Sequence, residues 1–433
     1  MDEKFVIVGR RPLKGEITVR GSKNAASKMM IASLLTDEAC TVENVPNSVE
    51  IDITRELCET VGSSVFLRPD RSLRVETKVI RTSLVPILSR KNRIPILALG
   101  PLLHRKGFAE VPVLGGCPIG HRPINFHVEA LGKMGIKIER RENSYYAEGK
   151  DIHGAKIEFP FPSVGATENV LLTAVLAKGE TVIKNAAIEP EIVNLIQMLA
   201  AMGAKISFAE SKRVIAVTGV EKLRGTTWKV MPDRNEIVSF ASAAIATYGE
   251  IFLKNAEASY LAAFLKKIKE IGAKFSVEKD GIRFFRSDGY NAVSIETGPH
   301  PGFMTDWQQP FTVLLTQATG ESIIHETVYE DRFGYTQDLV RMGADIRLSD
   351  KCAGKKCRFA DRGFKHTALV TGPTTLQGAK IIMTDIRAGM AHIIAALAAE
   401  GESVISGIEH IDRGYERIDE RLRALGADIK RLV

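Results

Sequence analysis

The sequence predicts an α/β fold made of six repeats, grouped into two domains of three repeats each, with helices inside and sheets around them. The first observation behind this prediction is a helical stretch that closes on a glycine and runs into a strand. It recurs six times at a nearly regular interval, which is typical of repeat proteins whose single repeats cannot bury an apolar face alone. The closing glycines are Gly62, Gly135, Gly203, Gly272, Gly343 and Gly426, separated by 73, 68, 69, 71 and 83 residues.

A second observation is that the polar loop opening the first helix of each repeat keeps the same interval. A third is that helices such as 241–247 and 388–399 consist almost entirely of small apolar residues and have little polar surface to offer to solvent. We therefore expect these helices at the centre, as in an α/β barrel turned inside out. The loops are represented by Asn24, Arg93, Gly165, Arg234, Asp306 and Arg387, spaced by 69, 72, 69, 72 and 81 residues.

The third repeat illustrates the order of elements. A polar segment, 163–167, precedes a helix expected over 168–177, and a strand is expected over 180–184. The second helix is expected over 191–202, because Ile192, Leu195 and Leu199 recur at helical spacing. Gly203 then supplies a left-handed cap, and the next strand is expected over 205–208.

Length and composition agree with two soluble domains. The chain has 433 residues, of which 45% are apolar and 26% charged, so six repeats of about 70 residues can build sizeable cores. The stretch 388–399 contains His392 and is far shorter than the roughly 20 residues that a membrane span needs. The N-terminus has no apolar leader, and five scattered cysteines do not form a disulfide framework. We expect a cytoplasmic protein with no membrane partner.

The net charge of +7 favours anionic partners. Lysine and arginine are spread over all six repeats, without a basic tail or basic residues interleaved with aromatic ones, so nucleic acid is not the expected partner. Phosphorylated small molecules fit this distribution better. The sequence leaves the oligomeric state open.

The polar loops are the candidate binding segments, because helix N-termini carry unpaired N–H groups and attract anions. Lys23, Arg93 and Arg387 oppose the helix dipole in this position, which points to a compensating anion from a ligand. The alternative is local capping, with Asp233 and Glu236 resembling a capping box. The residues for which capping is the simpler interpretation are Ser163, Asp233, Asp306 and Asp385.

A glycine-rich loop, 114–123, replaces the plain turn of the other repeats. Cys117 lies five residues before Arg122, and a thiol beside cations in a pliable loop can serve as nucleophile or proton donor. A cysteine in a glycine loop can also be incidental. Two further cysteines, Cys352 and Cys357, lack a second pair of ligands in the sequence, so we interpret their lysine-rich stretch as a surface excursion and expect no metal.

Together these residues resemble the enolpyruvyl transferases, in particular those that act on UDP-N-acetylglucosamine. The resemblance covers essentially the whole chain, and its most specific parts are the cysteine loop and the string Asp-Arg413-Gly-Tyr-Glu416. The supporting segments are 23–26, 98–101, 115–123, 163–167, 189–193, 232–234, 299–306, 326–333, 384–388 and 410–416.

The resemblance implies two inverse α/β barrel domains, each of three βαβαββ repeats. One would span residues 21–231 and carry the cysteine loop. The other would combine residues 1–20 with 232–433 and carry Asp306, Arg387 and Arg413. The implied reaction transfers enolpyruvyl from phosphoenolpyruvate to the 3-hydroxyl of UDP-N-acetylglucosamine, through a tetrahedral ketal and with release of phosphate, in peptidoglycan precursor synthesis. No metal or organic cofactor is implied.

The resemblance also implies roles for individual residues. Cys117 would deliver a proton to the methylene carbon and be alkylated by fosfomycin, and Asp306 would take the proton of the sugar hydroxyl. The catalytic set is Cys117, Asp306, Lys23 and Arg413. The phosphoenolpyruvate set is Lys23, Asn24, Arg122, Arg387 and Arg413. The nucleotide-sugar set is Arg93, Arg122, Pro123, Ser163, Val164, Gly165, Asp306 and Val328.

Three positions depart from the family pattern. Asn125 stands where a carboxylate is usual, Phe126 replaces a leucine, and Phe161 stands where a lysine is common. All three concern the uridine diphosphate region, so a different nucleotide sugar stays possible as the acceptor. The sequence also leaves open 5-enolpyruvylshikimate 3-phosphate synthesis, whose enzymes lack the cysteine loop, a protein of the same fold that binds RNA ends, and a paralogue that binds ligand without turnover.

Overall fold

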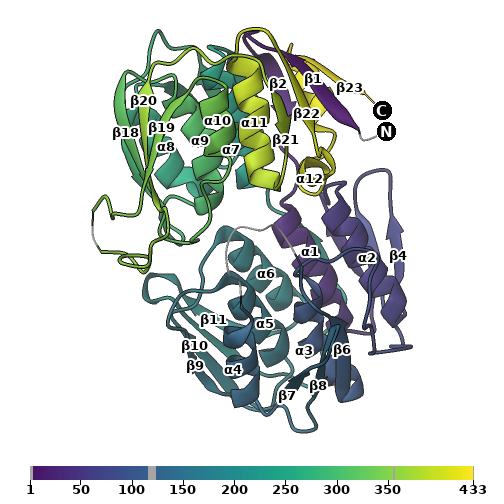
Figure 1. Ribbon diagram of the computed structural model, residues 1–433. Helices are drawn as coiled ribbons and strands as arrows, with labels where there is room; N and C mark the ends of the chain where they lie inside the picture. Colours follow the sequence, from purple (N-terminus) through teal and green to yellow (C-terminus); the bar gives the residue numbers. More distant parts are fainter. Residues whose placement is uncertain (1–2, 116–122, 355, 433) are drawn as a thin grey trace. The chain divides into compact units, whose positions relative to one another are not determined.

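The computed structural model describes residues 3–115, 123–354 and 356–432 (Figure 1). These residues form two compact units. We call residues 21–115 and 123–231 the middle unit, and residues 3–20 and 232–432 the terminal unit.

The middle unit contains two mixed sheets, one antiparallel sheet and six α-helices among its described residues. Its strands are β3 (Cys40–Glu43), β4 (Ser64–Leu67), β5 (Leu73–Glu76), β6 (Phe108–Pro112), β7 (Lys137–Arg140), β8 (Ser144–Glu148), β9 (Lys156–Glu158), β10 (Glu180–Lys184), β11 (Lys205–Ala209), β12 (Val214–Thr218) and β13 (Thr227–Lys229). Its helices are α1 (Lys23–Ala32), α2 (Val49–Val61), α3 (Leu99–Lys106), α4 (Asn125–Lys133), α5 (Val164–Ala174) and α6 (Pro190–Ala201), with short 3-10 helices at Ser33–Leu35, Pro95–Ala98 and Glu210–Lys212.

The terminal unit repeats this plan. Its strands are β1 (Lys4–Val8), β2 (Lys14–Thr18), β14 (Glu250–Lys254), β15 (Lys274–Glu278), β16 (Gly281–Phe285), β17 (Ser294–Glu296), β18 (Gly320–His325), β19 (Asp345–Ser349), β20 (Thr367–Gly372), β21 (Lys380–Ile382), β22 (Glu402–Ser406) and β23 (Asp428–Leu432). Its helices are α7 (Arg234–Ala246), α8 (Ala262–Glu270), α9 (Gln308–Leu315), α10 (Thr336–Arg341), α11 (Ile386–Ala398), α12 (Glu409–Asp412) and α13 (Ile418–Ala424), with 3-10 helices at Ala258–Leu261 and Thr305–Trp307.

The third repeat shows the topology that the others follow. Its order β9-α5-β10-α6-β11-β12 is βαβαββ, and its sheet runs β11-β12-β10-β9. The pair β9 and β10 is parallel, whereas β12 pairs antiparallel with both β10 and β11. The predicted α/β repeat fold is confirmed. In the sheet β6-β8-β7 the parallel fourth strand is reduced to a bridge between Leu84 and Glu110.

Strands from the beginning of the chain complete two sheets of the terminal unit. Strand β1 pairs antiparallel with β22 and β23, and β2 pairs parallel with β14. In the middle unit β13 pairs parallel with β3, so the sheet of the first repeat is completed by a strand that comes last in that unit. These long-range pairs hold distant segments of sequence in one sheet.

The boundaries of α5 differ from the prediction. The helix begins at Val164 rather than 168, because the Ser163 hydroxyl accepts a hydrogen bond from the Ala166 N–H and caps it. The predicted second helix, the strand after it and the strand before it agree with α6, β11 and β10 to within one residue.

The six closing glycines adopt the left-handed backbone conformation that the sequence predicts. Their φ angles are positive, from 82° at Gly272 to 113° at Gly62. A residue with a Cβ is strained in this region, which explains why glycine stands at this point in every repeat.

The alanine-rich helices lie inside, as predicted. Every residue of α7 and of α11 is buried, and Figure 1 shows α7, α9 and α11 side by side within the terminal unit. Small side chains allow this close approach. In the middle unit a Cβ at Gly100 of α3 would lie 2.2 Å from the Thr173 hydroxyl of α5, so these two helices also pack closely.

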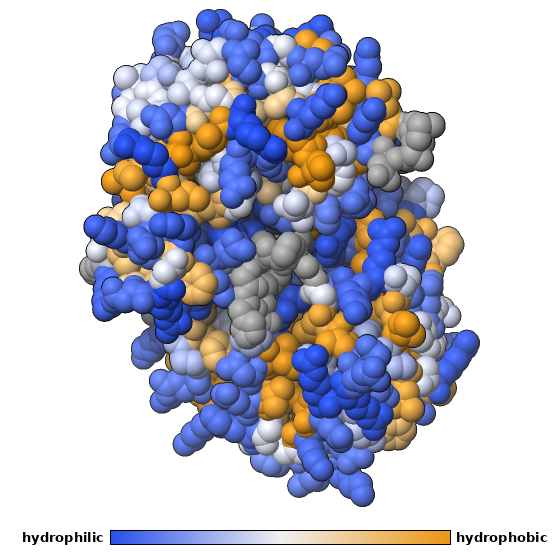
Figure 2. Space-filling view, viewed as in Figure 1, coloured by the Kyte–Doolittle hydropathy of each residue, from blue (hydrophilic) through white to orange (hydrophobic). Residues whose placement is uncertain are grey.

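The surface of the protein is mixed. On the face shown in Figure 2, hydrophobic residues occur in patches between hydrophilic ones. Within the described part of the chain, none of the helices has both the length and the apolar character that crossing a membrane requires.

Candidate active site

Asp306 is the centre of a buried charge cluster in the terminal unit. It lies in the 3-10 helix Thr305–Trp307 that leads into α9. Its Oδ1 accepts a hydrogen bond of 2.6 Å from Arg332 Nη2, and its Oδ2 one of 3.1 Å from Arg387 Nε. About 20% of the Asp306 side chain is exposed, against 2% for Arg332 and 7% for Arg387. Two guanidinium groups therefore favour the carboxylate form of a side chain that solvent can still reach.

Tyr415 and Ser239 form a hydrogen-bonded chain that ends on the Arg387 guanidinium group. Arg387 Nη1 donates to the Tyr415 hydroxyl at 2.8 Å, and the Tyr415 and Ser239 hydroxyls lie 2.7 Å apart. Burial acts to lower the pKa of Arg387, but Tyr415 and Asp306 outweigh it and raise that pKa. Arg387 therefore stays protonated, and its hydrogen bonds to Asp306 and Tyr415 fix the orientation of its guanidinium group.

Glu326 organises the loop after β18. Its Oε1 accepts hydrogen bonds from the backbone N–H groups of Val328 and Tyr329, and its Oε2 accepts one from the Thr305 hydroxyl. Burial raises the pKa of Glu326. The side chain thereby links Val328, a predicted nucleotide-sugar contact, to the residue preceding Asp306.

Three of the four capping interpretations are confirmed. Besides Ser163, the carboxylate of Asp233 accepts from the N–H groups of residues 235 and 236, and that of Asp385 accepts from 387 and 388. Asp306 is not a cap, because its oxygens contact arginine side chains.

The predicted capping box at Asp233 is wrong in its second half. Glu236 accepts from the Arg20 backbone N–H at 3.0 Å and pairs with Arg421 instead of returning to Asp233. The dipole argument also needs correction for Arg387, since a carboxylate of the protein, Asp306, provides the compensating anion.

In the middle unit, His127 of α4 interacts with two of the predicted nucleotide-sugar segments, which are Arg93 and the start of α5. His127 of α4 lies against the first turn of α5, where a Cβ at Gly165 would be 3.3 Å from its ring. Its Nδ1 is 3.1 Å from Asn169 Nδ2, and the positive charge of Arg93 acts on the same ring. Arg93 and the start of α5 therefore belong to one neighbourhood.

His127 gives the middle unit a testable dependence of stability on pH. Burial, with a contribution from the Arg93 charge, lowers the pKa of His127 from 6.5 to about 4. Between these values the unfolded chain binds a proton that the folded unit does not, so the stabilisation is complete above pH 6.5 and is lost as the pH falls toward 4. Between pH 7 and pH 5 the His127 contribution to the free energy of unfolding should fall by roughly 2 kcal/mol. The buried carboxyl of Glu168, whose pKa burial raises from 4.5 to about 7, acts in the opposite direction over this range, so the His127 contribution is measured as a difference between variant and parent.

The measurement is urea unfolding of His127→Gln and its parent at pH 7 and pH 5. The chain has two tryptophans, so a Trp307→Phe background leaves Trp228 as the reporter for the middle unit. Relative to its parent, His127→Gln should be more stable at pH 5 than at pH 7 by roughly 2 kcal/mol, whereas His153→Gln, at an exposed position, should follow its parent at both pH values. An unchanged pH effect in His127→Gln would contradict the assignment.

The remaining predicted residues fall at several places. Lys23 and Asn24 are the first two residues of α1 and are half-buried, and the half-buried Arg413 directly follows α12. Val164 and Pro123 are exposed. Cys117 and Arg122 lie outside the described residues.

The departures from the family pattern have a partial physical explanation. The Phe126 ring on α4 lies 6.2 Å from the Phe159 ring, so an aromatic contact occupies this position. Asn125 is exposed at the first position of α4. Phe161 is half-buried, three residues before α5.

Sequence reasoning assigned no role to Arg332, Glu326 or Tyr415, which complete the cluster around Asp306. All three lie in segments that carry the resemblance, and an ionisable side chain inside such a segment is the signal that the sequence offers. Each of these side chains is less than 6% exposed, which the sequence does not reveal.

Comparisons with known proteins agree with this picture. A model of the EPSP synthase (3-phosphoshikimate 1-carboxyvinyltransferase) family matches residues 7–422. A Protochlamydia amoebophila (strain UWE25) protein named UDP-N-acetylglucosamine 1-carboxyvinyltransferase is 47% identical, over 98% of this chain and 93% of that protein. A Zymomonas mobilis protein of the same name is 43% identical, over 99% of each.

Two solved structures share the fold. The enolpyruvyl transferase NikO from Streptomyces tendae has a TM-score of 0.87 at 20% identity, covering 99% of both chains. An EPSP synthase from Acinetobacter baumannii has a TM-score of 0.77 at 17% identity, covering 100% of both chains. At such identities these likenesses establish the architecture.

Proposed function

Because the chain belongs to the EPSP synthase family of enolpyruvyl transferases, we propose that it transfers enolpyruvyl from phosphoenolpyruvate to the 3-hydroxyl of UDP-N-acetylglucosamine and releases phosphate. The observation that carries this conclusion is 47% identity, over 98% of the chain, to a relative named for that activity. The protein acts in peptidoglycan precursor synthesis. We place it in the cytoplasm, which the free thiols of Cys40 and Cys58 support.

The proposed donor site is cationic. Phosphoenolpyruvate carries about three negative charges, which suits bidentate guanidinium groups and an ammonium group. We assign its phosphate and carboxylate to Lys23, Asn24, Arg122, Arg387 and Arg413. Arg387 is the best supported of these, because the contacts to Asp306 and Tyr415 use two of its five N–H donors and fix its direction.

The proposed chemistry is addition followed by elimination. The sugar hydroxyl oxygen bonds to the second carbon of phosphoenolpyruvate while Asp306 takes the hydroxyl proton and Cys117 gives a proton to the methylene carbon. This yields a tetrahedral ketal. Loss of a proton from the resulting methyl carbon then restores the double bond as phosphate leaves. A carboxylate has about four lone-pair positions, so Asp306 can accept a third hydrogen bond while it holds both arginines.

The proposed nucleotide-sugar contacts are Arg93, Arg122, Pro123, Ser163, Val164, Gly165, Asp306 and Val328. The start of α5 supports three of them, because its first-turn N–H groups and dipole favour a diphosphate. Glu326 supports Val328, because Glu326 Oε1 accepts a hydrogen bond from the Val328 backbone N–H at 2.7 Å and holds that backbone in place.

Shikimate 3-phosphate as acceptor and RNA binding are both disfavoured. The relatives named for UDP-N-acetylglucosamine are 41–47% identical to the chain, whereas the solved EPSP synthases are 17–18% identical.

The deciding experiment measures phosphate release from phosphoenolpyruvate with UDP-N-acetylglucosamine, with other UDP-sugars and with shikimate 3-phosphate, and identifies the product by mass spectrometry. We expect release only with UDP-N-acetylglucosamine, and a loss of at least about 100-fold in Cys117→Ser, with Cys40→Ser as the matched control. Release with shikimate 3-phosphate instead, or salt-dependent RNA binding without release, would overturn the proposal.

A further inference from the structure

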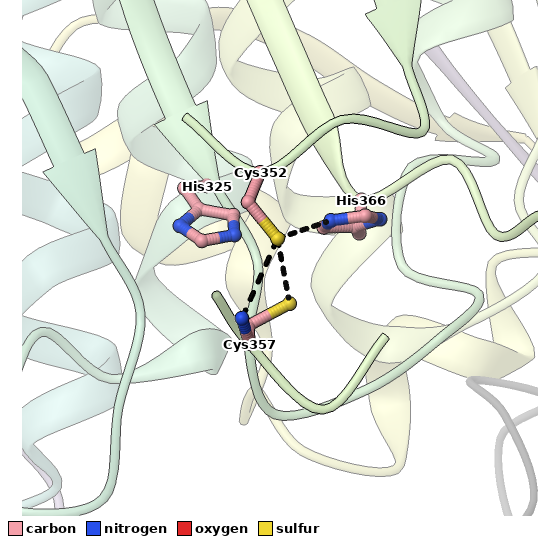
Figure 3. A group of neighbouring side chains, drawn as sticks. All are labelled: His325, Cys352, Cys357 and His366. Carbon is pink, nitrogen blue, oxygen red and sulfur yellow. Dashed lines mark hydrogen bonds between the residues drawn. The ribbon is translucent and has the colours of Figure 1, made fainter. Parts of the chain in front are cut away.

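Four metal-ligating side chains meet in the terminal unit, and none of them belongs to the proposed catalytic or substrate-binding sets. They are His325, Cys352, Cys357 and His366, and their ligand atoms all lie within 4.8 Å of one another. Figure 3 shows the two imidazole rings and the two thiols directed toward a common point. Whereas the sequence shows two cysteines without a second pair of ligands, the fold supplies that pair.

Strand pairing accounts for this meeting. His325 is the last residue of β18 and pairs in register with Thr367 of β20, so His366 lies next to it. The loop between β19 and β20, which contains both cysteines, starts and ends at the same edge of the sheet. The Thr367 hydroxyl donates to the Lys351 carbonyl at 2.7 Å and closes the loop at its base.

The distances match those of a tetrahedral centre before the metal enters. Zinc bonds of about 2.3 Å to sulfur and 2.0–2.1 Å to nitrogen give separations of about 3.8 Å between two sulfurs and about 3.5 Å between sulfur and nitrogen. Cys352 Sγ lies 3.5 Å from Cys357 Sγ and 3.4 Å from His366 Nε2. Small side-chain movements therefore suffice.

Both histidines present Nε2 to this point because another group occupies their Nδ1. Glu296 Oε2 lies 2.9 Å from His325 Nδ1, and the Phe364 carbonyl lies 2.8 Å from His366 Nδ1. Such outer partners are usual for histidines that bind metals. His325 is 2% exposed, and its Nε2 is buried without a hydrogen-bond partner among the described residues. A buried nitrogen of this kind is costly unless a ligand satisfies it.

The sulfurs are also arranged as thiolate ligands. The Cys357 backbone N–H points to Cys352 Sγ, and the Phe359 N–H points to Cys357 Sγ, each at 3.4 Å. The Cys357 N–H and the His366 ring lower the pKa of Cys352 to about 6, whereas burial and the neighbouring Cys352 raise the pKa of Cys357.

We propose that His325 Nε2, His366 Nε2, Cys352 Sγ and Cys357 Sγ form a structural zinc site. Two soft thiolates and two imidazoles in a closed tetrahedral set select Zn²⁺ over the harder divalent ions. The site fastens the loop between β19 and β20 to the sheet. Since Arg358 of this loop donates a hydrogen bond to the Val328 carbonyl, the metal also holds the segment that follows Glu326. This proposal does not depend on the identity of the reaction.

The first test measures zinc in the purified full-length protein by inductively coupled plasma mass spectrometry. We expect about one equivalent per chain, and less than about one tenth in Cys352→Ser/Cys357→Ser. The control, Cys40→Ala/Cys58→Ala, removes the same number of thiols and should retain the metal. Zinc retained by the serine variant, or no zinc in the wild type after reconstitution with ZnCl₂, would overturn the proposal.

A second test covers the case in which the serine variant does not fold. Wild-type protein freed of metal and loaded with Co²⁺ should show thiolate-to-cobalt charge-transfer absorption and the intense visible bands of a tetrahedral centre. Removing the metal should lower Tm by about 5 °C or more. Cobalt spectra without a sulfur band, or three titratable thiols in the denatured unreduced protein where five are expected, would assign the cysteines to another role.

Discussion

Asp306→Asn is expected to lower kcat by about 100- to 10,000-fold, the range of a lost general base. The asparagine side chain has the same shape but offers no carboxylate to take the sugar proton. Arg332 and Arg387, which are nearly fully buried, keep one oxygen to contact, so the terminal unit should still fold. The measurement is phosphate release at saturating phosphoenolpyruvate and UDP-N-acetylglucosamine, together with the Tm of each variant.

Two further variants separate catalysis from stability. Asp306→Ala leaves two buried guanidinium groups without their anion, a change that costs about 3–5 kcal/mol in other proteins, so this variant should lose stability as well as activity. Asp345→Asn, in the exposed pair with Arg347, should change neither. A kcat for Asp306→Asn within threefold of wild type would remove Asp306 from the proposed mechanism.

The sequence predicts the architecture well because the repeats carry strong local signals. A glycine with positive φ after the last helix of each repeat, and helices without polar surface, follow from rules that act over a few residues. The apolar pattern predicts a start of α5 at residue 168. The helix begins earlier, at Val164, because the Ser163 side chain caps it. Capping by Asp233 and Asp385 could also be predicted for the same local reason.

What the sequence does not predict are partners chosen over long range. Glu236 turns to Arg20 and Arg421, 216 and 185 residues away along the chain, instead of closing the capping box. Likewise Asp306 meets Arg387, 81 residues further on, and two cysteines meet a histidine that ends β18 and another that directly precedes β20. Sequence spacing constrains neighbours on one helix, whereas such pairs are set by sheet register and by packing.

Arg387→Lys tests whether activity needs the planar guanidinium group of this residue or only its positive charge. A lysine has one nitrogen and cannot contact Asp306 Oδ2 and the Tyr415 hydroxyl with the geometry that Arg387 Nε and Nη1 now provide. We expect kcat/KM for phosphoenolpyruvate to fall by about 30- to 1000-fold. This corresponds to a loss of about 2–4 kcal/mol of transition-state stabilisation.

A double-mutant cycle with Asp306→Asn gives this prediction a second measurement. Because the two residues share a hydrogen bond, their effects on kcat/KM should combine to less than the sum of the single losses. Arg347→Lys, at an arginine that pairs with Glu321 at the surface, is the matched control and should keep full activity. Full additivity would mean that Arg387 and Asp306 act separately, and wild-type kcat/KM in Arg387→Lys would exclude Arg387 from binding phosphoenolpyruvate through its guanidinium geometry.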